Sequence, residues 1–385
     1  MQSTKRIGAH ALQAPATKTL NMSTGPVEVT PRVRKAQDVG SFNPHQEPFW
    51  QYHDETVALL GKTMRTKSRV FMMHGSIRAG LDMALFNLIR QGTRVLCLQN
   101  GYWSQMIGDW AEARGAKVTR LSFNGLAPVD PETVRSALNK DHYDIVTMTQ
   151  VETNGGMLNP TQEVGEIVSK TDALFLLDTA CSVGAVELQT DEWNVDVSST
   201  GAHKCLGGIP GLAIVTFSDK AWRYMEKLPV QAGYFNAKTW WRQTMDRNFE
   251  VSFTPPAQLV MALRESLLEI NEIGLEDYWQ LHKEVADEVL DRFAQMDIHH
   301  IMDKGPAANQ RQAYSNTVLA MALPGSMEVE SFRLRLLENY GIFVGGNISE
   351  QRGTSFRLGL MTFAQMDRVN LYGTLGCMEE VIRQG

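Results

Sequence analysis

The sequence is poor in cysteine, and it has no CxxC pair and no histidine cluster with the spacing of metal ligands. Its four cysteines are scattered along 385 residues, at Cys97, Cys181, Cys205 and Cys377. Scattered cysteines are typical of reduced thiols and not of a disulfide framework. We therefore expect a cytoplasmic protein without a metal site.

The sequence also lacks an excess of positive charge and any long apolar run. Its formal net charge of −6 at pH 7 argues against a general nucleic-acid surface and gives no attraction to anionic membranes. No apolar run approaches the roughly 20 residues that cross a bilayer. Residues 1–20 contain no apolar signal core, so we expect a tail or an arm that packs on a partner subunit, and no secretory signal. The C-terminal Arg383-Gln384-Gly385 is not a peroxisomal address.

Length and patterning predict two domains. A chain of 385 residues with 43% hydrophobic and 21% charged content is ordinary for a globular protein with room for two cores. Between residues 70 and 218, short strands that are apolar on both faces alternate with helices, which predicts a mostly parallel sheet flanked by helices. After residue 256 the pattern becomes that of an α+β domain. We expect an α/β protein with a large domain over 21–270 and a smaller domain over 271–385.

Hydrophobic periodicity gives the expected elements. Strands are predicted over 94–98, 118–123, 144–149, 173–178 and 212–217, and helices over 77–90, 103–113, 131–138 and 161–169. In the C-terminal part, helices are predicted over 257–272, 275–296, 328–339 and 364–382, and strands over 316–322 and 356–359. Asp130 is the expected N-cap of the helix at 131, and His299-His300 is expected on a loop.

A lysine and an aspartate at the ends of two predicted strands carry the strongest chemical signal. Lys204 follows a short strand in a glycine-containing loop that allows a ligand to approach the backbone. Asp178 ends the strand 173–178, and ligands in α/β folds bind at the carboxyl ends of parallel strands. A lysine amine closes a Schiff base on the aldehyde of pyridoxal phosphate, and a carboxylate holds the pyridine nitrogen protonated. Each residue alone has an ordinary surface or turn interpretation, but the pair favours this cofactor.

Further polar and aromatic residues follow the predicted strands. The segment His74-Gly75-Ser76 opens a helix whose free amides can bind phosphate, unless Ser76 is an ordinary N-cap. Trp103 can stack on a flat cofactor ring or pack on the core. Thr153 and Asn154 can hydrogen-bond the phenolic oxygen of the cofactor or form a plain turn. Arg357, between apolar neighbours, needs an anion, which can be a substrate carboxylate or a structural ion-pair partner.

Taken in order, these segments resemble class V aminotransferases, the fold type I pyridoxal phosphate enzymes that include alanine–glyoxylate and serine–pyruvate transaminases. The resemblance covers most of the chain, from Thr24-Gly25-Pro26 to the C-terminal helix. Its specific parts are Asp178 with residues 182–184, the lysine loop 199–211, Thr254-Pro255 and the strand 356–359. The resemblance implies a fold type I transferase with a large domain, a small domain and bound pyridoxal 5′-phosphate.

The resemblance implies a role for each matching residue. Lys204 would form the Schiff base, Asp178 would hold the pyridine nitrogen, and Trp103 would stack on the ring. The other residues implied at the cofactor are Ser76, Ile77, Arg78 and His203 at its phosphate, Thr153 and Asn154 at its ring oxygen, and Thr254 of the partner subunit at the phosphate. Those expected at the substrate are Arg357 at its carboxylate, Gly25 at the mouth of the site, and Asn347 beside two glycines that leave room for a small substrate. The family implies a homodimer with shared active sites.

The phosphate loop departs from the family pattern. The family has Ser-Gly followed by Thr or His, whereas this chain has Ser76-Ile77-Arg78, so Arg78 could supply a charge-assisted bond to the phosphate. The same stretch, and the run after Lys204, also resemble pyridoxamine–pyruvate transaminase, which takes the free vitamin as a substrate and has an acidic residue in this loop. Ser76 stands at that position here, which favours a phosphorylated and retained cofactor.

The leading functional hypothesis is a transaminase that moves an amino group from alanine or serine to glyoxylate or pyruvate, through Lys204. Pyridoxamine–pyruvate transamination and a lyase or epimerase reaction on the same fold are the alternatives among enzymes. A non-catalytic cofactor-binding protein is the alternative from another class. The joint presence of Lys204, Asp178 and Arg357 favours catalysis over binding alone.

Overall fold

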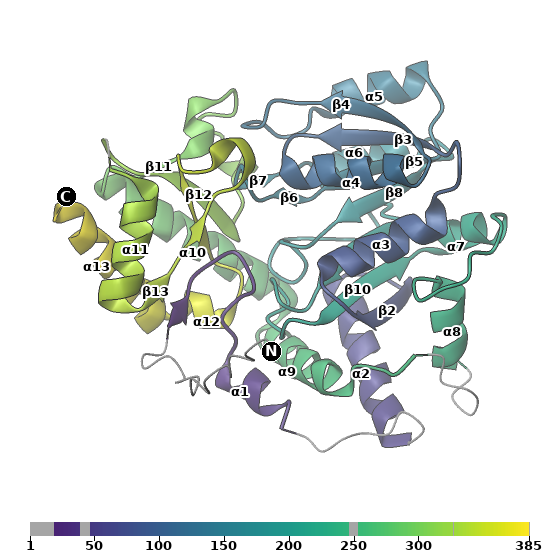
Figure 1. Cartoon of the computed structure of the whole chain (residues 1–385), viewed down its shortest axis with the longest axis horizontal. Coiled ribbons are helices and arrows are strands. Elements are labelled where there is room, and N and C mark those ends of the chain that lie inside the picture. Colours follow the sequence, from purple (N-terminus) through teal and green to yellow (C-terminus); the bar gives the residue numbers. More distant parts are fainter. Residues whose placement is uncertain (1–18, 39–46, 246–252, 326, 385) are drawn as a thin grey trace, which may run out of the picture.

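The computed structural model of the chain describes residues 19–38, 47–245, 253–325 and 327–384. Its largest element is a seven-stranded sheet in the order β2-β10-β9-β8-β5-β3-β4 (Figure 1). The strands are β2 (Arg69–His74), β3 (Arg94–Gln99), β4 (Lys117–Ser122), β5 (Ile145–Thr149), β8 (Leu174–Asp178), β9 (Val197–Gly201) and β10 (Leu212–Phe217). β10 runs opposite to the other six strands, which are parallel to one another, and this confirms the mostly parallel sheet.

Helices cover both faces of this sheet. One face carries α3 (Ile77–Leu88), α4 (Tyr102–Ala113), α7 (Asp219–Glu226) and α8 (Ala237–Met245). The other carries α2 (Glu47–Thr63), α5 (Pro131–Lys140), α6 (Thr161–Val168) and α9 (Ala257–Ile273). In β8, Leu174 and Leu176 pack into the first core, and Phe175 and Leu177 pack into the second. A strand buried on both sides needs apolar residues at every position, which explains the continuous apolar runs of the sequence.

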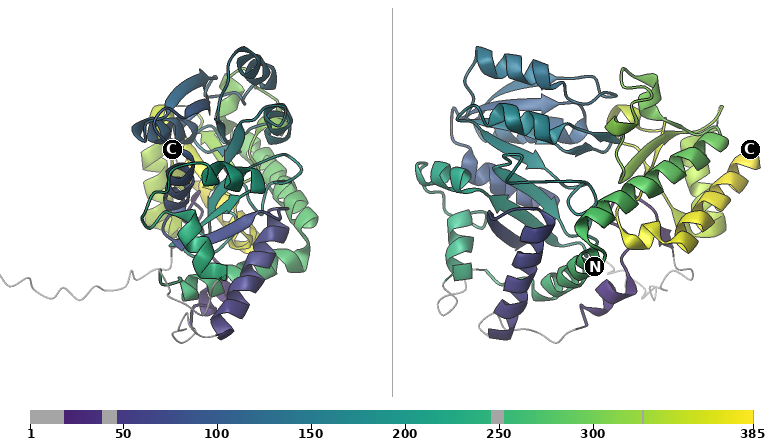
Figure 2. Two further views of the ribbon diagram at one scale, coloured as in Figure 1. Left: turned by 90° about the vertical axis from the view of Figure 1, so that its right-hand side faces the viewer. Right: turned by 180° about the vertical axis from the view of Figure 1, so that it is seen from behind.

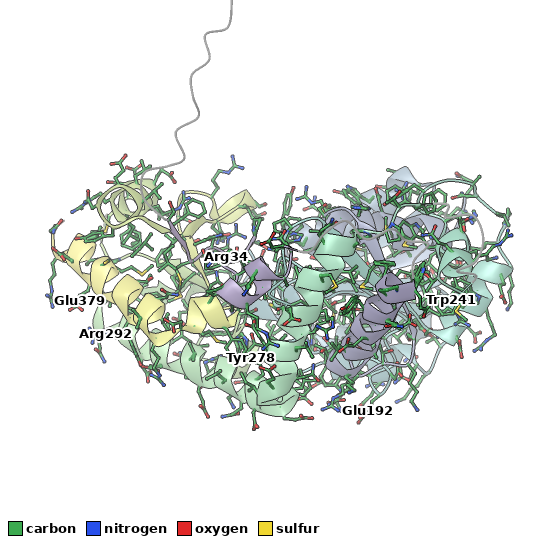
Figure 3. All side chains as sticks on the ribbon, turned by 90° about the horizontal axis from the view of Figure 1, so that it is seen from below. Arg34, Glu192, Trp241, Tyr278, Arg292 and Glu379 are labelled. Carbon is green, nitrogen blue, oxygen red and sulfur yellow. The ribbon has the colours of Figure 1, made fainter. Side chains whose placement is uncertain are left out.

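The C-terminal part forms a separate layer beside the large sheet, which is clearest from behind (right panel of Figure 2). It has an antiparallel sheet of β11 (His299–His300), β12 (Val318–Ala322), β15 (Phe356–Gly359) and β14 (Gly345–Gly346). Its helices are α10 (Leu275–Gln295), α11 (Val329–Tyr340), α12 (Phe363–Met366) and α13 (Arg368–Arg383). Arg292 of α10 and Glu379 of α13 form an ion pair at 2.9 Å (Figure 3).

Short elements join the two parts. β1 (Leu20–Asn21) pairs in parallel with β13 (Ile342–Phe343), so the start of the described chain belongs to the C-terminal core. The helix α1 (Pro31–Lys35) packs on α9, where Arg32 contacts Glu265 at 2.8 Å. β6 (Val151–Glu152) and β7 (Met157–Leu158) form a small hairpin after β5. This hairpin lies where the two parts of the chain meet, because Met157 also bridges to Tyr314.

Several sequence predictions need correction. The helix predicted over 364–382 is two helices, because the Asp367 side chain accepts from Val369 N and Asn370 N at 3.1 Å and so caps a new helix. His299-His300 is not on a loop: it forms β11 against β12, and His300 is buried. The predicted cap at Asp130 is confirmed, since its carboxylate accepts from Thr133 N at 3.0 Å. Among the described residues, no helix is long and apolar enough to cross a membrane.

Candidate active site

The carboxyl ends of five strands bring the predicted site residues to one edge of the large sheet. β2 leads into Ser76, β3 into Trp103, β5 into Thr153, and β9 into Lys204, while Asp178 is the last residue of β8. The strand register places these ends level with one another, because Thr149 pairs with Asp178, which in turn pairs with Ser199. Residues that are far apart in the sequence therefore meet where ligands bind in open α/β sheets.

A cavity of about 270 Å³ opens at this edge. Eight of the predicted site residues line it: Ser76, Ile77, Arg78, Trp103, Thr153, Asp178, His203 and Lys204. The rest of its wall is mainly apolar and comes from Leu81, Met106, Val151, Ala180 and Cys181. A cavity with a mainly apolar wall and a few convergent polar groups is typical of a small-molecule site.

The Lys204 side chain is held by the segment at the start of the described chain. Its Nζ donates a hydrogen bond to the Thr24 carbonyl. Gly25 lies against the same side chain with φ of +108°, and a Cβ atom there would lie 2.5 Å from Lys204 Cδ. Only glycine combines that backbone angle with so close an approach, so Gly25 gives the lysine its space. The sequence predicted Gly25 at the mouth of the site, and the structure places it against the lysine.

Asp178 presents a buried carboxylate to the cavity. The residue is 8% exposed, and within the described chain its side-chain carboxylate accepts one hydrogen bond, from Ala180 N at 2.8 Å. Burial raises the pKa of Asp178 to about 6, although the charge of Lys204 and the bond from Ala180 oppose the increase. A carboxylate with so few partners can accept a proton or pair with a cationic ring nitrogen.

A second group of residues that line the cavity is suited to an anion. Ser76 is the N-cap residue of α3, but its side chain does not cap the helix, and the first-turn amides of a helix attract phosphate. Burial lowers the pKa of His203 to about 4, with the Lys204 charge adding to the effect, so its imidazole is neutral at pH 7. The buried Nδ1 of His203 has no hydrogen-bond partner among the described residues. The Arg78 guanidinium lies 4.8 Å from the centre of the Trp103 ring.

Thr153 links the aromatic ring to the C-terminal part of the chain. Its Oγ1 accepts from Trp103 Nε1 at 2.7 Å and from Arg357 Nη1 at 3.2 Å. Arg357 also donates to the Gly346 carbonyl from Nε at 3.2 Å and from Nη2 at 3.0 Å. No carboxylate in the described part of the chain forms an ion pair with Arg357, and burial lowers its pKa. The structural ion pair that the sequence left open is therefore absent from the described residues, and the remaining N–H groups are available to an anion.

Five predicted residues do not line the cavity: Gly25, Asn154, Thr254, Asn347 and Arg357. Gly25 lies against Lys204, and Arg357 reaches the site through Thr153. Asn347 Nδ2 donates to the Asn154 carbonyl at 2.9 Å, and Asn154 Oδ1 accepts from Tyr102 N at 3.3 Å, so this pair supports the walls. Thr254 is exposed and lies outside the cavity of its own chain. The role predicted for it needs a second subunit, and it stays a prediction.

Glu152 is the residue that sequence reasoning missed. It is fully buried next to Thr153 and bonded to the first turn of α4. The sequence placed it in the run 152–156, interpreted either as a contact to the ring oxygen of the cofactor or as a plain turn, and no role was predicted for Glu152 itself. No local pattern marked it, because a glutamate is almost never fully buried unless it is paired, and the partners of Glu152 lie on α4, in another segment of the chain.

Comparison with known proteins gives a consistent picture. A family model described as aminotransferase class-V matches residues 49–345. An uncharacterized aminotransferase of Methanocaldococcus jannaschii is 29% identical over 96% of this chain and 94% of its own length. The (S)-ureidoglycine–glyoxylate transaminase of Bacillus subtilis is 26% identical over 94% of this chain and 90% of its own length. The crystal structure of an alanine–glyoxylate aminotransferase from Nostoc sp. superposes with a TM-score of 0.90 at 25% identity, covering 99% of this chain and 100% of that one.

Proposed function

Because this chain belongs to the class V aminotransferase family and is a pyridoxal phosphate-dependent enzyme of fold type I, we propose that it transfers an amino group from a small amino acid, alanine or serine, to glyoxylate or pyruvate. The cofactor supplies an electron sink for the bond changes at the substrate Cα. The protein supplies binding, orientation and proton transfer.

The polar groups of the cavity fit the chemistry of this cofactor. Lys204 offers an amine for the cofactor aldehyde, and Asp178 a buried carboxylate for the pyridine nitrogen. The first turn of α3, which no side chain caps, and the unpartnered His203 Nδ1 suit a phosphate. The Trp103 indole also lines the cavity and offers a stacking surface. Once freed from the cofactor, the Lys204 amine can move a proton at the substrate Cα.

Arg357 is the main observation in support of an amino-acid substrate. Its guanidinium is fixed by the Gly346 carbonyl and Thr153 Oγ1, and it has no carboxylate partner among the described residues. A half-buried cation without a counter-ion is costly unless an anion binds there in the working enzyme. A planar guanidinium suits a substrate carboxylate.

The size of the cavity and the relatives support small substrates. A space of about 270 Å³ that also holds the cofactor leaves little room for a long side chain. The Bacillus subtilis relative and the Nostoc enzyme are both named for glyoxylate. We therefore place glyoxylate first among the acceptors.

Assembly and location complete the proposal. We propose a homodimer with shared active sites, which the exposed position of Thr254 outside its own cavity supports. We also propose a cytoplasmic enzyme, since all four cysteines are free thiols.

The test is a half-reaction followed by absorbance. The purified enzyme is mixed with L-alanine or L-serine, and the visible band of the lysine-bound cofactor is expected to bleach and to return when glyoxylate or pyruvate is added. Lys204→Ala should lack this band and this response. A band that neither amino acid bleaches would refute the small-amino-acid donor. Turnover without a 2-oxo acid would indicate the lyase or epimerase alternative, and use of unphosphorylated pyridoxamine as the donor would indicate pyridoxamine–pyruvate transamination.

A further inference from the structure

Glu152 is a fully buried carboxylate that contacts the start of α4. Its Oε2 accepts from Ser104 N at 3.0 Å and from Ser104 Oγ at 3.0 Å, and its Oε1 accepts from Trp103 N at 3.3 Å. It does not line the cavity, so its effect on the cofactor must pass through other residues.

The first turn of α4 needs this carboxylate. A helix begins with backbone N–H groups that have no partner within the helix, and the N-cap side chain usually accepts from one of them. Here the N-cap residue is Gly101, which has no side chain. A Cβ atom at Gly101 would lie 2.3 Å from Glu152 Cγ. The glycine therefore makes room for the Glu152 side chain of β6, which caps the helix in its place.

The residues after Glu152 hold the same turn from the other side. Thr153 Oγ1 accepts from the Trp103 indole, and Asn154 Oδ1 accepts from Tyr102 N. The backbone of Trp103 is thus fixed by Glu152 and its ring by Thr153, two consecutive residues of one hairpin. A shift of the helix start would turn the ring and disturb Thr153, which also holds Arg357.

From these contacts we propose that Glu152 is a positioning residue that sets the stacking surface of Trp103 for the cofactor. The proposal rests on the proposed function only through the cofactor, and not through the identity of either substrate. A purely structural cap would stabilise α4 without changing how the cofactor is seated.

The main test compares Glu152→Gln with a matched control. Glutamine keeps the size of the side chain but replaces one of two acceptor oxygens with an NH₂ group, which then faces a backbone N–H. Asp196→Asn makes the same chemical change at a buried carboxylate at the opposite edge of the sheet. Asp196 accepts from Phe175 N at 3.1 Å and Ser218 Oγ at 2.7 Å, and it also pairs with Lys220 Nζ at 3.5 Å. Both variants are expected to lower the unfolding temperature of the cofactor-free protein. Only Glu152→Gln is expected to weaken the binding of added pyridoxal phosphate, by roughly tenfold, and to reduce the circular dichroism induced in the cofactor band.

A double variant tests the route of the effect. In a Trp103→Ala background the cofactor has no indole to stack on, so adding Glu152→Gln should cause no further loss of binding or of induced circular dichroism. If Glu152→Gln does not fold, Glu152→Asp keeps the charge but shortens the side chain by one methylene, and it should give the same spectroscopic loss.

Three outcomes would overturn the proposal. The first is cofactor affinity and induced circular dichroism at wild-type levels in Glu152→Gln or Glu152→Asp. The second is a loss of cofactor affinity and induced circular dichroism in Asp196→Asn equal to the loss in Glu152→Gln. The third is a full additive loss of both quantities when Glu152→Gln is added to the Trp103→Ala background. None of these measurements uses an amino acid or a 2-oxo acid, so failure of the substrate assignment would leave them unchanged and the two failures can be distinguished.

Discussion

Replacing Asp178 by asparagine should change how the stability of the cofactor-free protein depends on pH. Asp178 ends β8 with 8% of its surface exposed, and burial raises its pKa to about 6 from the usual 3.8. The folded protein therefore holds the Asp178 proton more tightly than the unfolded chain does. The stabilising effect of this proton is complete below pH 3.8 and is lost as the pH rises through about 6.

The size of the effect follows from the shift. The difference between the two pKa values corresponds to about 3 kcal/mol of unfolding free energy over the whole range. Between about pH 4 and pH 8 the loss is about 2 kcal/mol, because the unfolded aspartate is already partly ionised at the lower pH. Glu152, whose pKa burial raises to about 7, changes stability in the same direction. The comparison must therefore be between the wild type and Asp178→Asn, which both keep Glu152.

The assay is urea unfolding of both cofactor-free proteins across this pH range. The wild type should lose about 2 kcal/mol more than Asp178→Asn between about pH 4 and pH 8. Adding pyridoxal phosphate should remove most of this difference, because a protonated ring nitrogen pairs with the ionised carboxylate. Equal pH dependence in the two cofactor-free proteins would show that Asp178 is not a proton-binding group of the folded state, and the reasoning would fail.

The remaining predictions concern the residues around the cavity. Gly25→Ala should weaken cofactor binding and slow transamination, because the new methyl group meets Lys204 Cδ at 2.5 Å and the residue has φ of +108°; wild-type rates would contradict this packing. Arg357→Gln should raise KM for alanine by roughly a hundredfold while cofactor affinity stays nearly unchanged, and steady-state kinetics with a cofactor titration would separate the two. Thr153→Val should affect both quantities, since one hydroxyl holds Trp103 and Arg357, whereas Thr153→Ser should restore them; an effect on KM alone would refute this link.

Local sequence patterns were sufficient to predict most helices and strands of the fold. The strands Leu212–Phe217 and Phe356–Gly359 match their predicted bounds residue for residue, because apolar runs between turn residues have few alternative structures. The cap at Asp130 is also a local signal, and its hydrogen bond confirms it. Asp367 carried the same kind of signal, but the amphipathic pattern continued through it, and so one helix was predicted where there are two.

The sequence by itself determined the mostly parallel sheet and the residue types that can hold pyridoxal phosphate, because strand periodicity and side-chain chemistry are local properties. It also placed Lys204 and Asp178 at strand ends, and the parallel sheet then brings such ends to one edge. Only the tertiary structure decided which distant groups complete the site. The Thr24 carbonyl that holds Lys204 and the Glu152 carboxylate that caps α4 come from distant segments, and no short-range pattern specifies such contacts, since packing and chain crossing create them.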